Sequence, residues 1–128
     1  MSDSPSTAHR SLRDRLFRRP PQVIDATTAY QQLQDGAITL LDVRETNEWN
    51  AGRAPGARHM PLGHLNPAQL PTDRPVVTVC RSGSRSARAA SQLRAAGLDV
   101  MNLRGGMSSW VHHDLPLIAA GNKPGRLV

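Results

Sequence analysis

Short apolar runs alternate along this chain with segments that have helical spacing. The two clearest runs, residues 37–43 and 76–79, are almost continuously apolar, which is typical of parallel strands buried on both faces. Shorter strands are predicted at residues 23–25, 57–60 and 98–103. Strands and helices that alternate in this way predict an α/β fold with a mainly parallel five-stranded sheet.

The segments between the strands predict the helices. Asp25 or Thr27 can cap a helix that continues to residue 34, and shorter helices are predicted at 45–50 and 107–112. The most regular helix spans residues 84–96 and ends at Gly97. Its predicted buried face consists of residues spaced by three: Ala87, Ala90, Leu93 and Ala96. Trp110 is predicted to pack in the core, as large aromatic side chains usually do.

Length and composition fit one domain. A chain of 128 residues can bury a core without disulfides, and its single cysteine excludes an intramolecular disulfide. Because no stretch approaches the 18 apolar residues of a membrane helix, we expect a reducing, cytoplasmic setting. We divide the chain into a basic arm (residues 1–21), a folded domain (22–117) and a C-terminal tail (118–128).

The net charge of +6 does not by itself predict nucleic-acid binding. Much of the excess lies in the N-terminal arm, at Arg10, Arg13, Arg15, Arg18 and Arg19. Aromatic residues for stacking on bases make up only 3% of the chain. We interpret the arm as a solvated segment that could dock a partner. His59 and His64 lack nearby ligands at metal spacing, so no metal or cofactor is expected.

The segment after the strand at 76–79 carries the candidate chemistry. Cys80 ends the strand, and a loop of small and basic residues leads into the next helix: Arg81, Ser82, Gly83, Ser84 and Arg85. Backbone N–H groups of such a loop, together with a helix N-terminus and two arginines, form an anion-binding cradle. Neighbouring cations and a helix N-terminus lower the pKa of a cysteine, so we predict that Cys80 is a nucleophilic thiolate. A buried, inert cysteine is the alternative.

Four segments in this order resemble the rhodanese (sulfurtransferase) family over residues 22–117. They are the Cys80 loop, Leu41-Asp42-Val43-Arg44-Glu45, Pro55-Gly56-Ala57 and Arg104-Gly105-Gly106-Met107-Ser108-Ser109-Trp110. The resemblance implies five strands with helices on both faces of the sheet. The family usually reads Gly-His-Ile-Pro-Gly-Ala where this chain has Arg53 and Ala54 in the second and third places.

Charged residues after the strand at 37–43 are predicted to fix the loop beside the cysteine. Asp42, Arg44 and Glu48 are interpreted as one ion-pair set, because a charge at the end of a buried strand requires a partner. The resemblance implies that Asp42 and Arg44 support the active-site loop from behind, without touching the substrate.

The resemblance and the loop together predict sulfur transfer. Cys80 would take a sulfane sulfur from thiosulfate or a similar donor, with sulfite held by Arg81, Arg85 and the loop N–H groups. It would then pass the sulfur to an external thiol, cyanide or protein acceptor, because the chain has no second cysteine.

Two alternatives stay open at this point. A cysteine phosphatase or arsenate reductase also uses a cysteine in an anion-binding loop. However, phosphatases place five residues between cysteine and arginine, and here four separate Cys80 from Arg85. A rhodanese-like module that only binds or regulates is the second alternative.

Overall fold

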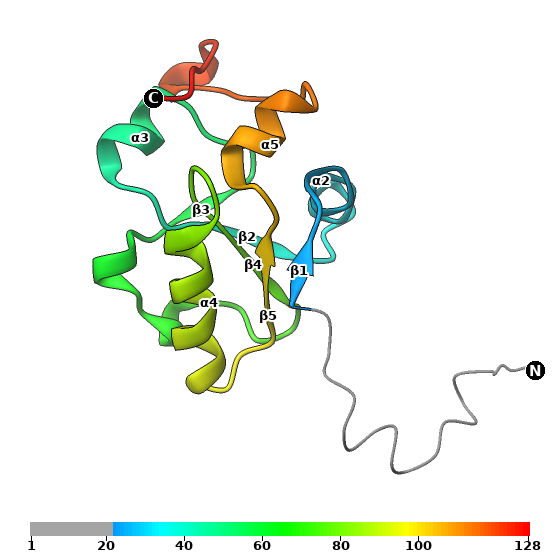
Figure 1. The fold of residues 1–128 in the computed structure, drawn as a ribbon, viewed down its shortest axis with the longest axis vertical. Helices are drawn as coiled ribbons and strands as arrows, with labels where there is room; N and C mark the ends of the chain where they lie inside the picture. The colour runs from blue at the N-terminus through cyan, green and yellow to red at the C-terminus, as the bar shows by residue number, and fades with distance from the viewer. Residues whose placement is uncertain (1–21) are drawn as a thin grey trace, which may run out of the picture.

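The computed structural model describes residues 22–128 and shows one parallel sheet of five strands (Figure 1). The basic arm predicted at 1–21 lies outside the described residues. The strands are β1 (Val23–Ile24), β2 (Thr39–Asp42), β3 (Arg58–His59), β4 (Val76–Val79) and β5 (Val100–Leu103). Their order is β1-β5-β4-β2-β3, and every neighbouring pair is parallel. The predicted α/β fold is confirmed.

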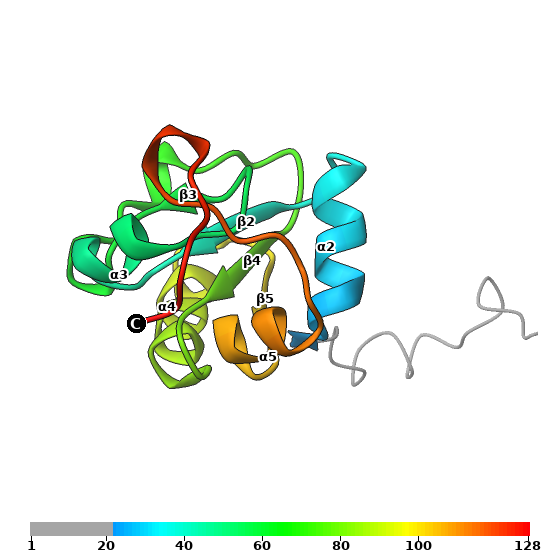
Figure 2. The ribbon, with the colours of Figure 1, turned by 90° about the horizontal axis from the view of Figure 1, so that it is seen from above.

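Helices cover both faces of the sheet (Figure 2). On one face lie α2 (Ala26–Gln34) and α5 (Gly106–His112), which contact each other. On the other face α4 (Ser84–Ala95) packs against β4 and β5, and the 3-10 turn η2 (Leu62–His64) contacts α4. A second turn, η3 (Pro67–Gln69), follows η2. The short helix α3 (Thr46–Ala51) follows β2 at the carboxyl ends of the strands.

The core is divided in two by the sheet. All residues of β2 and β4 are buried, as their continuous apolar pattern predicts. Trp110 anchors the cluster under α2 and α5: it has no exposed surface, and its indole N–H donates to the carbonyl of Pro116 at 2.7 Å. Its ring meets Tyr30 edge to face, with centroids 5.6 Å apart. Trp110 is therefore a core residue, as predicted.

The buried face of α4 differs from the prediction. Ser86, Ala89, Ala90 and Leu93 face the core, whereas Ala87 and Ala96 are exposed. An α-helix has 3.6 residues per turn, so positions spaced strictly by three rotate steadily away from one face. Steps of three and four residues keep the stripe in place, and they bring Ser86 inward at the start of the helix.

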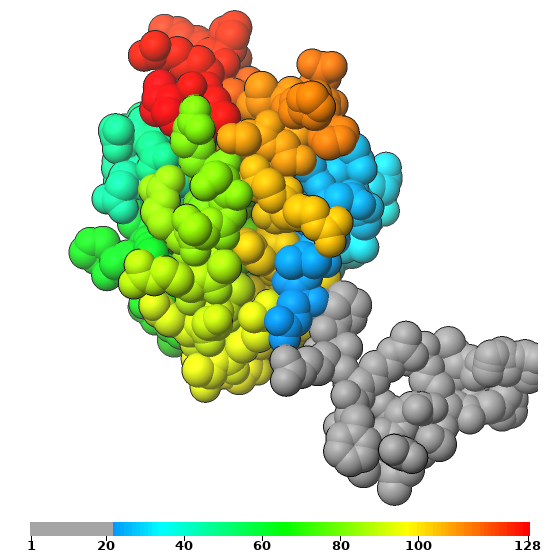
Figure 3. Space-filling model, in the orientation of Figure 1, coloured from blue at the N-terminus to red at the C-terminus, as the bar shows by residue number. Residues whose placement is uncertain are grey.

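The segment predicted as a tail, residues 118–128, packs back onto the domain. Ile118 and Arg53 exchange both backbone hydrogen bonds, at 2.8 and 2.9 Å. Beyond the 3-10 turn η4 (Ala120–Asn122), the N–H of Arg126 donates to Ala51 at the end of α3. Figure 3 shows these last residues against the surface beside the start of α4. The C-terminal segment therefore lies next to the Cys80 loop.

Candidate active site

The loop from Cys80 to Gly83 joins β4 to α4 at the carboxyl end of the sheet. In open α/β sheets, ligands bind outside the carboxyl ends of the strands. Gly83 caps α4 with φ 118°, in the left-handed region that glycine adopts without strain. The sharp turn brings the first residues of the helix back over the cysteine.

The start of α5 fixes the orientation of the loop's peptide groups. The N–H of Met107 donates to the carbonyl of Cys80 at 2.8 Å, and the N–H of Ser108 donates to the carbonyl of Arg81 at 3.0 Å. Because a trans peptide points its C=O and N–H in opposite directions, the N–H of Ser82 is turned away from α5. A Cβ at Gly106 would overlap these two carbonyl oxygens, which explains the glycine.

The Cys80 sulfur lies beneath a set of converging donors. The N–H of Gly83 donates to Sγ at 3.1 Å, and the Ser86 hydroxyl lies 3.3 Å from Sγ. Burial raises the pKa of the thiol, since Cys80 is only 1% exposed. Hydrogen bonds from the Ser86 hydroxyl and from the backbone N–H groups of Ser86, Gly83 and Ser82 outweigh this effect, so the pKa of Cys80 lies below its usual value. The sequence predicted a lowered pKa from cations and a helix N-terminus; backbone N–H groups at the start of α4 do contribute, but the Ser86 hydroxyl was not anticipated.

Ser86 is the functional residue that the sequence analysis missed. Its hydroxyl contacts Sγ and also lies 3.2 Å from the carbonyl of Gly83. Two buried or half-buried partners hold this region: the Thr78 hydroxyl donates to the Ser86 carbonyl at 2.9 Å, and the Asn102 amide donates to the Gly83 carbonyl at 3.1 Å. A small hydroxyl residue on the inward face of the first turn after a cysteine is the signal that could have identified it.

The two loop arginines have partners of their own. Arg85 forms a bidentate ion pair with Glu48 of α3, at 2.6 and 2.9 Å, which lowers the pKa of that carboxyl. The prediction that Glu48 belongs to the Asp42 and Arg44 set is therefore wrong. The carboxylate of Glu48 binds Arg85 instead, because α3 places Glu48 next to the first turn of α4. The Nε–H of Arg81 donates to a backbone oxygen of Val128 at 3.1 Å.

The hydroxyl residues Ser82 and Ser84 are exposed. The structure thus places all five predicted anion ligands around one loop, but it gives each arginine a protein partner. Their role in binding substrate stays a prediction.

Asp42 and Arg44 form a fully buried ion pair, with Nη2 and Oδ2 2.7 Å apart. The Nε–H of Arg44 contacts the same carboxylate, and Nη2 also donates to the carbonyl of Gly52 at the end of α3. Val43, which lies between these two residues, donates its N–H to the carbonyl of Val79, the residue directly before Cys80. The pair therefore ties the chain after β2 to α3, beside the loop, while its supporting role in catalysis stays a prediction.

The residues that depart from the family pattern fit their surroundings. The guanidinium of Arg53 lies 4.8 Å from the centre of the Trp49 ring, within cation–π distance. Trp49 stacks on His59 with centroids 4.7 Å apart, and His59 Nε2 lies 2.7 Å from the carbonyl of Arg44. Ala54 is buried at 2% exposure. Arg53 thus packs on Trp49 at the position where the family pattern has a histidine.

Within residues 22–128, no group of three or more His, Cys, Asp or Glu side chains is placed to hold a metal ion. In the same part of the chain, no helix is long and apolar enough to span a membrane.

Comparison with known proteins decides the family. The family model for the rhodanese-like domain matches residues 25–113. The chain belongs to the rhodanese family. It is 41% identical over 101 residues to a sulfurtransferase of Allochromatium vinosum, an alignment that covers 75% of this chain and 94% of the relative. It is also 39% identical over 100 residues to the uncharacterized protein slr1261 of Synechocystis, covering 76% of this chain and 56% of that protein.

Solved structures of rhodanese-like proteins share the fold. A rhodanese-related protein from Thermoplasma volcanium matches with a TM-score of 0.71 and 30% identity, over 76% of this chain and 97% of that one. The rhodanese-like domain of the Anabaena protein Alr3790, solved by NMR, matches with a TM-score of 0.70 and 28% identity, over 86% and 92% of the two chains. The resemblance found in the sequence is confirmed, and with it the helices on both faces of the sheet.

Proposed function

We propose that this rhodanese moves a sulfane sulfur from thiosulfate or a similar anionic donor to an external acceptor, through a persulfide on Cys80. The observation that carries the proposal is the set of donors converging on Sγ, which favours the thiolate. Membership of the family, and the relative named sulfurtransferase, support the reaction class.

In the first half-reaction the Cys80 thiolate attacks the outer sulfur of the donor. A new S–S bond forms to Cys80 while the S–S bond of thiosulfate breaks, and the electron pair leaves with sulfite. No proton is transferred. The negative charge on the donor and on the departing sulfite is balanced by the N-terminus of α4, the N–H groups of the loop and Arg81.

In the second half-reaction an acceptor thiolate or cyanide attacks the outer sulfur of the persulfide. The S–S bond to Cys80 breaks, and Cys80 leaves as the thiolate. A lowered pKa makes it a good leaving group. The acceptor is external because the sequence holds one cysteine. A free thiolate persists best in a reducing compartment such as the cytoplasm, which is the setting we propose.

Arg85 has little free hydrogen-bonding capacity for the anionic sulfur donor. Its Nη1 and Nη2 already bind Glu48, so it can hold sulfite only by sharing its guanidinium. Glu48 chiefly raises the pKa of Arg85, and the Cys80 thiolate contributes to the same shift. Arg85 lies in the first turn of α4, directly after the loop, and we propose that its charge supplements the loop N–H groups.

The experiment is steady-state formation of thiocyanate from thiosulfate and cyanide. We expect parallel double-reciprocal lines, which indicate a covalent intermediate, and we expect Cys80→Ser to abolish turnover. Ser91→Ala, an exposed position on α4, is the matched control and should leave turnover unchanged. Activity retained by Cys80→Ser would exclude the mechanism. A binding or regulatory module predicts no turnover with any sulfane donor.

A further inference from the structure

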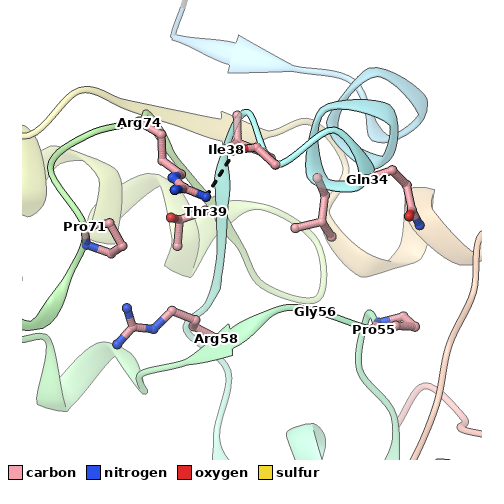
Figure 4. Close-up of a pocket in the computed structure, with 10 residues that line it drawn as sticks. Gln34, Ile38, Thr39, Pro55, Gly56, Arg58, Pro71 and Arg74 are labelled. Atoms are coloured by element: carbon pink, nitrogen blue, oxygen red, sulfur yellow. Dashed lines mark hydrogen bonds between the residues drawn. The ribbon is translucent and has the colours of Figure 1, made fainter.

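A pocket lies at the amino ends of the parallel strands, whereas the Cys80 loop lies at their carboxyl ends (Figure 4). Two strands contribute their first residues to it, Thr39 of β2 and Arg58 of β3, whereas Cys80 follows the last residue of β4. Its volume is about 570 Å³, within the range of sites for small organic molecules. Nothing in the proposed sulfur transfer uses this pocket.

One side of the pocket is cationic. Figure 4 shows the side chains of Arg58 and Arg74 reaching the same side of the opening, with Thr39 between them. Arg74 is held in place by Asp73, with two contacts of 3.1 Å, and it donates to the carbonyl of Gly36 at 3.1 Å. That contact also covers a carbonyl oxygen at the end of α2, which would otherwise repel an anion.

Arg58 differs from Arg74 because it has no ion pair or hydrogen bond through its side chain to any residue between 22 and 128. Its guanidinium is therefore available to a ligand. The lining residues include no carboxylate, and the nearby Asp73 is neutralised by Arg74. A guanidinium presents a planar fork of N–H donors that matches a carboxylate.

The rest of the lining is largely apolar, with Gln34 of α2 as its polar side chain. Leu33 also comes from α2, Ile38 directly precedes β2, and two prolines, Pro55 and Pro71, complete the walls. Ile38 is 3% exposed, so this wall is anchored in the core. Pro55 lies on the side of the pocket away from the two arginines (Figure 4). A ligand that fits needs an apolar body with an acid group at one end.

We propose that this pocket binds a small organic carboxylate with an apolar body, and that Arg58 is its carboxylate ligand. One guanidinium that is unpaired within residues 22–128, with Thr39 beside it, matches a single negative charge. The helical residues of the lining come from the C-terminal end of α2, so the pocket has no helix N-terminus of the kind that favours a multiply charged phosphate or sulfate at the Cys80 loop. Apolar contact with the two prolines and with Leu33, which is only half-buried, adds selectivity for the body of the ligand.

Titration with phenylacetate, followed by ¹H–¹⁵N NMR, tests the proposal. We expect saturable shifts at the amides of Gly36, Thr39 and Gly56, which line the pocket. A hydrogen bond to a charged group contributes roughly 1.5–3 kcal/mol, so the neutral isostere phenylacetamide should bind at least about tenfold more weakly. Arg58→Gln should weaken phenylacetate binding by a similar factor.

The controls separate this site from the sulfur-transfer site. Arg88→Gln, an exposed change on α4, should leave phenylacetate binding unchanged, and so should Cys80→Ser. Because Arg58 is exposed, its replacement should keep the fold, which the same spectra report. The proposal is overturned if no saturable shifts appear at the pocket amides, if phenylacetamide binds equally well, or if Arg58→Gln binds as tightly as the wild type.

Discussion

Replacing Ser86 with alanine should raise the pKa of Cys80 without removing the nucleophile. Ser86 is fully buried, and its hydroxyl lies 3.3 Å from Sγ, so water does not replace the lost donor easily. The N–H groups of Ser82, Gly83 and residue 86 remain in the variant. The thiolate should therefore become less favourable but still accessible.

The size of the effect follows from the lost hydrogen bond. A bond to a charged acceptor contributes roughly 1.5–3 kcal/mol, and the lower figure corresponds to about tenfold in the ionisation equilibrium. We use that lower figure because the Ser86 hydroxyl is shared with the Gly83 carbonyl, 3.2 Å away. A thiolate of higher pKa is also more nucleophilic, with a Brønsted coefficient of about 0.4–0.5, which offsets roughly a factor of three.

The two effects act on different parts of the pH profile. Below the pKa, Ser86→Ala should react about threefold more slowly with a neutral disulfide such as dithiodipyridine, because the thiolate is scarcer. Well above the pKa, where both proteins are thiolates, it should react about threefold faster. The profiles of the wild type and the variant should therefore cross.

Stopped-flow measurement of this reaction from acid to alkaline pH gives both limbs in one series. Ser91→Ala, an exposed change on α4 away from the loop, is the control and should follow the wild-type profile. If the Ser86→Ala profile coincides with that of the wild type, the Ser86 hydroxyl does not stabilise the thiolate, and our account of the lowered pKa fails.

Three further substitutions test the framework of the site. Glu48→Gln should lower the free energy of unfolding by about 1 kcal/mol at neutral pH, since the Arg85 side chain is 33% exposed and partly screened. Because pairing lowers the pKa of Glu48, this difference should be complete above its ordinary value of 4.5 and vanish as the pH falls through the lowered pKa, as urea unfolding can show. Gly106→Ala should cost about 2–3 kcal/mol or more, because its methyl group meets two backbone carbonyls, and should lower the melting temperature. Asp42→Asn should cost about 3–5 kcal/mol in urea unfolding, because it leaves a buried guanidinium without its charge partner.

The variants Gly106→Ala and Asp42→Asn each have a matched control. Gly97→Ala changes a glycine with φ 96° and no atom near the added methyl group, so it should cost only about 1–2 kcal/mol of backbone strain. Asp73→Asn breaks an exposed, solvent-screened pair with Arg74 and should leave the free energy of unfolding nearly unchanged. If the controls were as destabilising as Gly106→Ala and Asp42→Asn, burial and steric contact would not explain the effects.

The sequence predicts the central strands well because burial on both faces leaves a plain signal. β4 lies at residues 76–79 as predicted, and β2 falls within the predicted run at 37–43. The edge strands β1 and β3 are only two residues long, so their pairing depends on neighbours that local patterns do not describe. Cys80 and its loop are visible for a different reason, since glycine, serine and arginine rarely follow a core strand together.

Partners from distant segments account for what the sequence could not predict. Glu48 reaches Arg85 across 37 residues, and Arg81 meets Val128 across 47. Such pairs follow from the placement of α3 and of the C-terminal segment in three dimensions. Ser86 escaped because strict spacing by three placed Ala87 on the buried face instead. A stripe with mixed steps of three and four would have turned Ser86 toward the sulfur.

Intact-protein mass before and after incubation with thiosulfate tests the central claim most directly. Our account predicts a gain of one sulfur atom, about 32 Da, on the wild type, its loss on treatment with dithiothreitol, and no gain on Cys80→Ser. An unchanged mass of the wild type, with Cys80 still open to alkylation, would contradict the persulfide mechanism.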